Sequence, residues 1–206
     1  MTRHRLVLAT RNVGKIEEFR RILDDIAPGQ IELVGLEQFP ELGDVEETGT
    51  SFEENSLLKA RTVCEQTGLP AIADDSGLCV DALGGNPGIF SARWSGVHGN
   101  DKANLEKVLL ELAHVSIVDR TAHFTCVTSL AMPDGSSITQ EGILKGYIAN
   151  MPAGDKGFGY DPIFHPVGSE LSLAQMDSSA KDAISHRGQS LRAIAPKVVT
   201  MLASLR

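Results

Sequence analysis

The N-terminal segment of the chain carries the feature that most restricts its fold: a strand, a turn, a helix and a second strand in direct succession. Residues 5–10 form an apolar run that indicates a buried strand, and residues 31–34 form a second one. Between them, apolar residues recur at helical spacing, namely Ile16, Phe19, Ile22, Leu23 and Ile26, and polar residues that include Glu17 and Glu18 occupy the opposite face. This succession is typical of α/β folds, so we expect that class.

The remaining sequence continues the alternation of helices and strands. Helices are predicted over 51–67 and 100–113, and from 185 to the C-terminus with a kink or restart at Pro196. Thr50 and Glu53 fit a capping box for the first of these helices. Strands are predicted over 71–73, with 78–80 as a candidate continuation, and over 120–132 and 137–148, which pair as a long hairpin. Residues 149–166 are rich in Gly and Pro and indicate a loop, and we expect residues 1–206 to form a single domain with two lobes.

Net charge and cysteine spacing exclude several classes of protein. Nineteen basic side chains against 27 acidic ones give a formal net charge of −8, which argues against binding to duplex nucleic acid. The 3 cysteines lie far apart, so the sequence has no C-x-x-C motif of a zinc ribbon or a thioredoxin-like site, and we expect reduced thiols. No apolar run has the length of a signal peptide or a membrane span. We therefore expect a cytoplasmic protein with neither a nucleic acid nor a membrane as partner.

The first polar cluster is the turn from Thr10 to Lys15, which precedes the first predicted helix. A helix N-terminus offers unpaired backbone N–H groups and the positive end of the helix dipole, both of which suit a phosphate. The dipole disfavours a lysine in the first turn, so Lys15 indicates another role. The turn does not match the Walker A pattern. The alternative is an ordinary turn with a solvated lysine.

The second and third clusters are acidic. Asp74 and Asp75 follow an apolar strand, and ligands of open α/β sheets bind beyond the carboxyl ends of strands. Such carboxylates commonly hold Mg²⁺, although an Asx-type turn is the alternative. The loop with Glu46 and Glu47 has the composition of solvated surface, or it supplies a further carboxylate to a metal.

The fourth cluster lies in the C-terminal part of the chain and comprises 157–162, Lys181 and 185–187. Aromatic residues flanked by glycines can lie flat against a nucleotide base, and Asp, His and Arg side chains can bind ring edges or phosphate oxygens. The alternative is a loop with a core Phe, followed by a helix that begins at Ser185. Trp94 next to Arg93 could also stack on a base, but we expect a lone Trp to belong to the core or to an interface.

In combination these clusters resemble a known family. The motifs T-x-N-x-G-K, E-E-T-G-x-x-F-x-E-N, A-D-D-S-G-L, G-G-x-P-G-I-x-S-A-R, G-F-G-Y-D-P-I-F and I-S-H-R-G follow one another between Thr10 and Gln189. Their order is similar to that of the inosine/xanthosine triphosphate pyrophosphatases, which remove non-canonical purine nucleotides from the nucleotide pool. The resemblance implies an α/β fold with a long central mixed β-sheet flanked by helices and two lobes around a nucleotide-binding cleft. It also implies a homodimer.

The resemblance further implies a role for each matching residue. The triphosphate would be held by Thr10, Arg11, Asn12, Val13, Gly14 and Lys15, chiefly through Asn12 and Lys15. Mg²⁺ would bind Glu46 and Asp75, with Glu47 and Asp74 as alternative ligands, and Asp75 would also act as the catalytic base. Ser76 would touch the substrate, and the purine would be bound by Phe158, Gly159, Tyr160, Asp161, Lys181, His186 and Arg187. Many members have glycine in place of Arg11, which leaves open whether its side chain contacts phosphate or points to solvent.

The implied reaction is the Mg²⁺-dependent hydrolysis of ITP, dITP or XTP to the monophosphate and pyrophosphate. Two other functions stay open: a house-cleaning pyrophosphatase for a pyrimidine or another modified nucleotide, and a nucleotide-binding regulator without turnover. Pure binding does not require several convergent carboxylates, so Glu46, Asp74 and Asp75 favour an enzyme.

Overall fold

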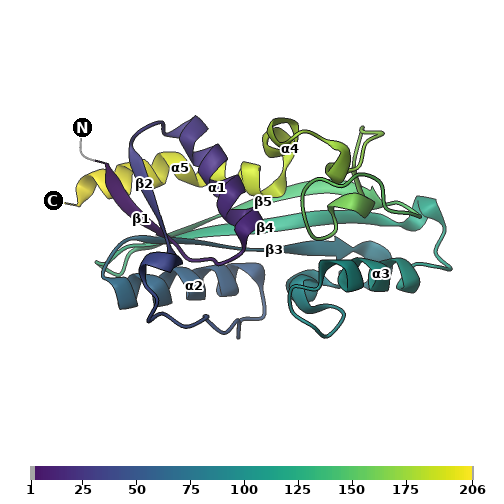
Figure 1. The fold of residues 1–206 in the computed structure, drawn as a ribbon, viewed down its shortest axis with the longest axis horizontal. Coiled ribbons are helices and arrows are strands. Elements are labelled where there is room, and N and C mark those ends of the chain that lie inside the picture. Colours follow the sequence, from purple (N-terminus) through teal and green to yellow (C-terminus); the bar gives the residue numbers. More distant parts are fainter. Residues whose placement is uncertain (1–2, 206) are drawn as a thin grey trace. The chain divides into compact units, whose positions relative to one another are not determined.

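The computed structural model describes residues 3–205, and within that range it contains a mixed six-stranded sheet flanked by helices (Figure 1). The strands lie in the order β2-β1-β3-β4-β5-β6. Their bounds are His4–Leu8 (β1), Ile31–Gly35 (β2), Ala71–Val80 (β3), Thr121–Ala131 (β4), Ser137–Ile148 (β5) and Phe164–Pro166 (β6). β1 is parallel to β2 and β3, whereas β5 and β6 are antiparallel. The predicted α/β class with a mixed sheet is therefore confirmed; Met1, Thr2 and Arg206 lie outside the described residues.

The α-helices are Val13–Ile26 (α1), Phe52–Thr67 (α2), Asp101–Glu111 (α3), Ser178–Ile184 (α4) and His186–Ser204 (α5). The sequence predicted four of them; α4 was not predicted, and neither was β6, which lies in the predicted loop 149–166. β3 is one strand that runs through both aspartates, and α5 contains Pro196 within a continuous helix. The predicted capping box is wrong by one residue, because the side chain of Ser51 accepts the hydrogen bond from the Glu54 N–H.

The chain divides into two compact units. Unit 1 takes the chain up to Asp75, then Cys126–Gly142 and the chain from Arg187 onward, and unit 2 takes Ser76–Thr125 and Ile143–His186. The predicted description as a single domain with two lobes stays a prediction. Each unit is described separately below.

In unit 1, the alternation of side chains along the strands divides the core into two layers. Leu6 and Leu8 of β1 point to one face of the sheet and pack in a cluster with apolar residues of α1 and α5. Val7 and Ala9 point to the other face and pack with the apolar residues of α2. Figure 1 shows α1 and α5 on one side of the strands of this unit and α2 on the other. This layering brings the first turns of α1 and α2 to the middle of β3, where Lys15 contacts Asp74 and Asn55 contacts Asp75.

In unit 2, a second core forms around β4, β5 and α3. Phe124 of β4 and Phe164 of β6 pack with their ring centroids 4.7 Å apart and their planes tilted by 50°. Leu105 and Val108 of α3 cover the same cluster, to which Tyr160 also belongs. The loop that contains Tyr160 is therefore fixed to the core of this unit.

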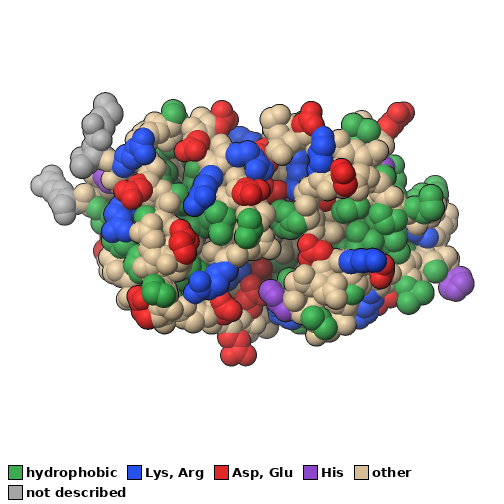
Figure 2. Space-filling view, in the orientation of Figure 1, with side chains coloured by type: hydrophobic (Ala, Val, Ile, Leu, Met, Phe, Trp, Pro, Cys, Tyr) green, Lys and Arg blue, Asp and Glu red, His purple; other side chains and the backbone are tan. Residues whose placement is uncertain are grey.

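The distribution of surface charge and the character of the helices relate to the expectations that neither a nucleic acid nor a membrane is a partner. On the face that Figure 2 shows, Lys and Arg side chains lie interspersed with Asp and Glu. Within residues 3–205, no helix combines the length and the apolar character that crossing a bilayer requires.

Candidate functional site

Two carboxylates of unit 1 converge on a single lysine. The ammonium nitrogen of Lys59 in α2 lies 2.7 Å from Glu47 Oε1 and 3.6 Å from Asp75 Oδ1. Asp75 is the last residue of the unit 1 part of β3. Glu47 belongs to the acidic loop, residues 40–49, which lies between β2 and α2. The side chains are shielded from solvent, with 12% of Lys59, 22% of Glu47 and 7% of Asp75 exposed. The acidic loop and β3 thus place two carboxylates around one cation.

The charges of this cluster change the titration of its members. Burial raises the pKa of Asp75; Lys59 lowers it and Glu47 raises it again, so the pKa lies above its ordinary value. Burial lowers the pKa of Lys59, but Asp75 and Glu47 outweigh this effect and the pKa is raised. Two carboxylates that repel each other in a shielded place are stabilised by a cation.

The donor set of this cluster fits a magnesium ion. Mg²⁺ typically binds one or two carboxylates and completes its octahedron with waters and substrate phosphates. Glu47 and Asp75 supply two hard oxygen donors around a position that already holds a cationic nitrogen. Among residues 3–205, the structure has no group of three or more His, Cys, Asp or Glu arranged to hold a metal.

Glu46 and Glu47 occupy different environments. The sequence assigned Glu46 as the metal ligand with Glu47 as the alternative, and in this structure Glu47 is the one beside Asp75. Glu46 is exposed, whereas Glu47 is half-buried and paired with Lys59. Exposure alternates along this loop from residue 45 to residue 50, so Glu46 lies on its exposed side and Glu47 on its half-buried side in this conformation.

Arg11 holds the start of the acidic loop. Its Nη2 donates to the Leu42 carbonyl oxygen at 2.6 Å, and its Nε lies 3.1 Å from Asp44 Oδ1. Neither of the two alternatives for Arg11, a phosphate contact or a solvent-facing side chain, included this contact. A substrate contact of Arg11 stays a prediction.

The turn before α1 has the geometry of a capped helix N-terminus. Asn12 is the N-cap, and its Oδ1 accepts a hydrogen bond from the Lys15 N–H at 3.0 Å. The Asn12 N–H donates to Thr10 Oγ1 at 3.2 Å, which fixes the entry of the chain into the turn. The Val13 side chain is exposed and Gly14 lies in the first turn of the helix. The predicted position of this segment at a helix N-terminus is therefore correct.

Asp74 lies at the centre of a buried ion cluster in unit 1. Its Oδ2 is 3.0 Å from the Lys15 ammonium nitrogen and 3.1 Å from Arg187 Nη2. Glu18 forms a second ion pair with Arg187 and is 3% exposed, so the expectation that Glu18 belongs to the polar face of its helix is wrong. Glu18 faces inward because it pairs with the buried guanidinium of Arg187 in α5, which also pairs with Asp74. The guanidinium of Arg187 thus binds two carboxylates, and its predicted contact with the purine stays a prediction.

In unit 2, Asp161 binds two other predicted site residues, Phe158 and Lys181. Its Oδ2 accepts hydrogen bonds from the Phe158 N–H at 2.9 Å and from Lys181 Nζ at 2.7 Å. Lys181 also lies 4.9 Å from the centroid of the Phe158 ring, within the range of a cation–π contact. A Cβ at Gly157, whose φ is +74°, would lie 2.1 Å from Asp161 Oδ2, so this turn requires glycine. The predicted residues Phe158, Asp161 and Lys181 form one cluster.

Other members of the predicted purine site are anchored in the same unit. The Gly159 N–H donates to Asp101 Oδ2 at 2.8 Å, and Tyr160 donates its hydroxyl to the Ser91 carbonyl oxygen at 2.8 Å. The imidazole of His186 is buried and stacks on Phe124, with centroids 4.7 Å apart and planes 9° from parallel. Ser76, the remaining predicted residue of unit 2, is half-buried in β3.

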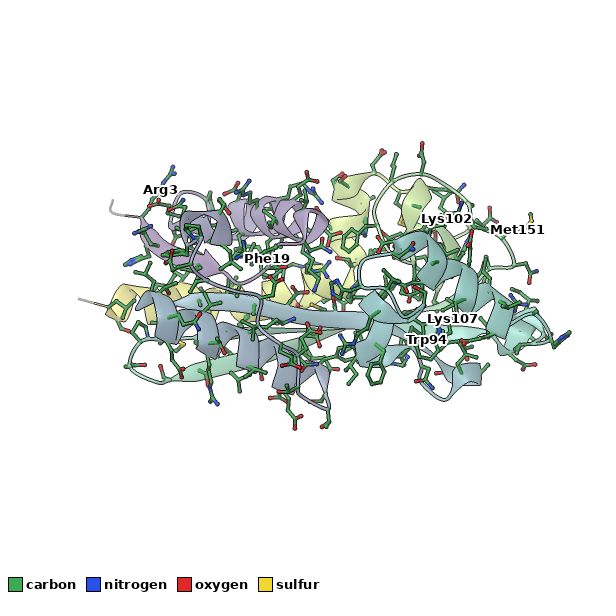
Figure 3. The ribbon with its side chains drawn as sticks, turned by 60° about the horizontal axis from the view of Figure 1, so that its bottom comes forward. Arg3, Phe19, Trp94, Lys102, Lys107 and Met151 are labelled. Atoms are coloured by element: carbon green, nitrogen blue, oxygen red, sulfur yellow. The ribbon has the colours of Figure 1, made fainter. Side chains whose placement is uncertain are left out.

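Trp94 contacts two side chains of α3, Lys107 and Glu111, and packs against the core of unit 2, as expected for a residue of the core. Its Nε1 donates to Glu111 Oε2 at 3.0 Å, and the Lys107 ammonium nitrogen lies 4.3 Å from the ring centroid. Figure 3 shows Trp94 and Lys107 next to each other. Lys107 therefore covers one face of the ring.

Unit 1 also contains a cavity of about 590 Å³ that includes none of the predicted site residues. It lies between the C-terminal half of α2 and the turn that joins β4 to β5, and Arg61, Cys64, Met132 and Asp134 contribute to its wall.

Sequence reasoning missed two residues of α2 that touch the carboxylates, Asn55 and Lys59. Asn55 Nδ2 donates to Asp75 Oδ2 at 3.1 Å, and Lys59 pairs with Asp75 Oδ1. The signal was available: the two residues are four positions apart, so they lie on one face of the helix that follows the acidic loop.

The comparisons with known proteins agree over nearly the whole chain. The model of the Ham1 family matches residues 6–197. A protein of Streptomyces avermitilis named dITP/XTP pyrophosphatase is 52% identical over 96% of this chain and 98% of its own length, and a protein of Streptomyces coelicolor with the same name is 53% identical over the same shares.

Solved structures lead to the same family. A crystal structure of a nucleoside-triphosphatase / dITP/XTP pyrophosphatase from Mycobacterium abscessus is 46% identical, with a TM-score of 0.75 over 93% of this chain and 99% of that chain. The Ham1 protein of Staphylococcus aureus is 39% identical, with a TM-score of 0.82 over 94% of this chain and 97% of that chain.

Proposed function

Because the chain belongs to the Ham1 family, we propose that it hydrolyses non-canonical purine nucleoside triphosphates, ITP, dITP and XTP, to the monophosphate and pyrophosphate. The observation that carries this proposal is the identity of 52% and 53% with two dITP/XTP pyrophosphatases over 96% of the chain. Proteins that are about half identical over nearly their whole length share one fold. The protein is thus a hydrolase of phosphoric anhydride bonds.

Asp75 is the proposed base. Burial and Glu47 favour proton uptake by this carboxylate, whereas a bound Mg²⁺ would favour its ionised form, so Asp75 would serve both as a metal ligand and as the acceptor of the water proton. Lys59 and Asn55 hold its two oxygens in fixed directions. In the proposed reaction the Asp75 carboxylate takes a proton from the attacking water as the new bond to the α-phosphorus forms and the pyrophosphate leaves.

Mg²⁺ is the proposed cofactor, held by Asp75 and Glu47, with Glu46 as the alternative. A bound divalent ion would neutralise the charge that develops on the leaving pyrophosphate. On the protein side, the N–H groups at the start of α1 and the Lys15 ammonium group would bind phosphate oxygens of the substrate. Asn12 positions this turn through its N-cap hydrogen bond.

Discrimination between bases is assigned to residues of unit 2. The 6-oxo group of hypoxanthine or xanthine accepts a hydrogen bond, whereas adenine presents a donor at the same place. A buried donor such as His186 would pair with the former and be left without a partner by the latter, and mismatches of this kind reduce turnover by orders of magnitude. Phe158 offers an aromatic face for the purine, and Asp161 and Lys181 fix the position of its loop.

The decisive experiment measures pyrophosphate release from ITP, XTP, dITP, ATP and UTP, with Mg²⁺ and with EDTA. We expect release from ITP, XTP and dITP in the presence of Mg²⁺ and none with EDTA. Preferred release from UTP would favour a pyrimidine house-cleaning enzyme, and orthophosphate as the product would contradict attack at the α-phosphorus. The absence of any turnover would favour a nucleotide-binding regulator.

The homodimer and the cytoplasmic location stay predictions. Light scattering after gel filtration tests the predicted homodimer.

A further inference from the structure

Asn55 links the two segments that carry the carboxylates of unit 1. It is fully buried in the second turn of α2. Its Nδ2 donates to Asp75 Oδ2 at 3.1 Å, and its Oδ1 accepts from the Gly49 N–H at 2.8 Å. One amide therefore binds β3 with its donor and the acidic loop with its acceptor.

Lys59 makes a parallel link one helical turn further along α2. It pairs with Glu47 of the acidic loop and with Asp75 Oδ1, whereas Asn55 binds Asp75 Oδ2. The two side chains together hold both oxygens of the Asp75 carboxylate from a single helix. They also hold the acidic loop at two points, Glu47 and Gly49.

Neither helix propensity nor packing accounts for an asparagine at this position. Asparagine is a poor residue for a helix interior, and a buried amide is costly unless both its oxygen and its nitrogen are bonded. An aspartate would lose the donor to Asp75, and a leucine would lose both bonds. The position requires a side chain with a donor at one end and an acceptor at the other.

Gly49 shows how closely the acidic loop approaches this amide. A Cβ at Gly49 would lie 2.7 Å from Asn55 Oδ1 and 2.7 Å from the Glu54 Cβ. The loop can therefore make its bond to Asn55 only with glycine at this position. The glycine two residues after Glu47 is explained by the same contact.

We propose that Asn55 is a positioning residue that sets the distance and orientation between Glu47 and Asp75 and thereby preforms the divalent-cation site. This inference rests on the proposed function for its place in the reaction. The test of this inference is independent of the proposed function, because cation binding can be measured without substrate. Residues outside the ligand shell that orient ligands typically change metal affinity by about 10- to 100-fold.

The test compares Asn55→Ala with Asn104→Ala. Asn104 is a matched control in unit 2: it is 1% exposed, its Oδ1 accepts from the Ser95 N–H at 2.7 Å, and its Nδ2 donates to the Ala92 carbonyl oxygen at 3.2 Å. Both variants remove a buried amide that bridges a loop, but Asn104 contacts none of the carboxylates above. Mn²⁺ binding to the substrate-free proteins is measured by electron paramagnetic resonance.

We expect the Kd for Mn²⁺ to rise by about tenfold or more in Asn55→Ala and to stay within about twofold in Asn104→Ala. The Mg²⁺ concentration for half-maximal pyrophosphate release should rise by the same factor, and excess Mg²⁺ should restore most of kcat without a change in KM for dITP. A residue with a merely structural role would lower the melting temperature and leave this metal dependence unchanged.

If Asn55→Ala does not fold, Gly49→Ala replaces it, since a Cβ at Gly49 would lie 2.7 Å from Asn55 Oδ1 and displace the loop from this acceptor. Unchanged Mn²⁺ affinity in folded variants would overturn the inference, as would a wild-type protein that binds no Mn²⁺. A wild-type protein that binds Mn²⁺ but releases no pyrophosphate would contradict the proposed function. The inference about the cation site would then be decided by the Mn²⁺ affinities of the wild type and the variants alone.

Discussion

Arg187 donates Nε and Nη2 to the same oxygen of Asp74, at 3.2 and 3.1 Å, although the two residues are 113 positions apart in the sequence. Burial would raise the pKa of Asp74, but Lys15 and Arg187 outweigh it and hold the pKa far below its usual range. Asp74 therefore stays ionised at neutral pH, and its charge is balanced by two cations of unit 1. This environment favours a structural and positioning role for Asp74 over its predicted role as an alternative metal ligand.

Arg187→Met should destabilise the protein by about 3–5 kcal/mol, because it leaves Glu18 and Asp74 buried without the guanidinium that balances them. Urea unfolding followed by circular dichroism measures this loss. Arg20→Met, which removes an exposed cation of α1, is the control and should change stability by less than about 0.5 kcal/mol. A loss below about 1 kcal/mol in Arg187→Met would contradict the importance of the buried cluster.

Asp75→Asn should lower kcat by at least about 100-fold while the protein stays folded, because the amide can neither take a proton from water nor supply a second anionic oxygen to Mg²⁺. The assay is pyrophosphate release from dITP at saturating Mg²⁺. Asp44→Asn, in the same acidic loop region but paired with Arg11, is the control and should retain most of the activity. Retention of more than about a tenth of wild-type kcat in Asp75→Asn would exclude its catalytic role.

Glu47→Gln and Glu46→Gln should separate the two candidate metal ligands. Glu47 faces the shared lysine together with Asp75, so its substitution should raise the Mg²⁺ concentration for half-maximal activity by at least about tenfold. Glu46 is exposed, and its substitution should change that concentration by less than about twofold. The reverse order would show that the acidic loop rearranges when Mg²⁺ binds and that the assignment from sequence was correct.

His186→Ala should reduce the preference for ITP over ATP by at least about tenfold, because the imidazole held on Phe124 is the proposed hydrogen-bond partner of the 6-oxo group. The ratio of kcat/KM for the two nucleotides is the readout. His165→Ala is the matched control, since His165 also stacks on an aromatic ring of unit 2, that of Tyr147, with centroids 5.2 Å apart. Equal losses for ITP and ATP in His186→Ala would rule out a role in base recognition.

The three thiols should be unreactive in the folded protein. Cys64, Cys79 and Cys126 are free and buried, and burial raises the pKa of Cys79 to about 11 and that of Cys126 to about 12. At pH 8 both therefore stay protonated, and thiolate is the reactive form. Ellman's reagent should label none of them rapidly in buffer and all 3 in guanidinium chloride. Fast labelling of one thiol in buffer would reveal an opening of the surrounding core.

The sequence by itself determined the class of the fold, the order of most elements and the family. These properties depend on local patterns: apolar periodicity fixes α1 and the strands, and Asn12 caps its helix through a bond to a residue three positions away. The short elements β6 and α4 escaped prediction because three and seven residues carry too little periodicity, and pairing with β5 stabilises β6.

The tertiary structure decided which charges meet. Glu18 has the sequence context of a solvent-facing residue and is buried because Arg187 arrives from α5, and Glu47 rather than Glu46 faces Asp75 because Lys59 lies across from it on α2. Arg11 points to the acidic loop because its guanidinium pairs with Asp44 and donates to the Leu42 carbonyl oxygen. Coulomb interactions act through space between segments that only folding brings together, so no local pattern specifies them.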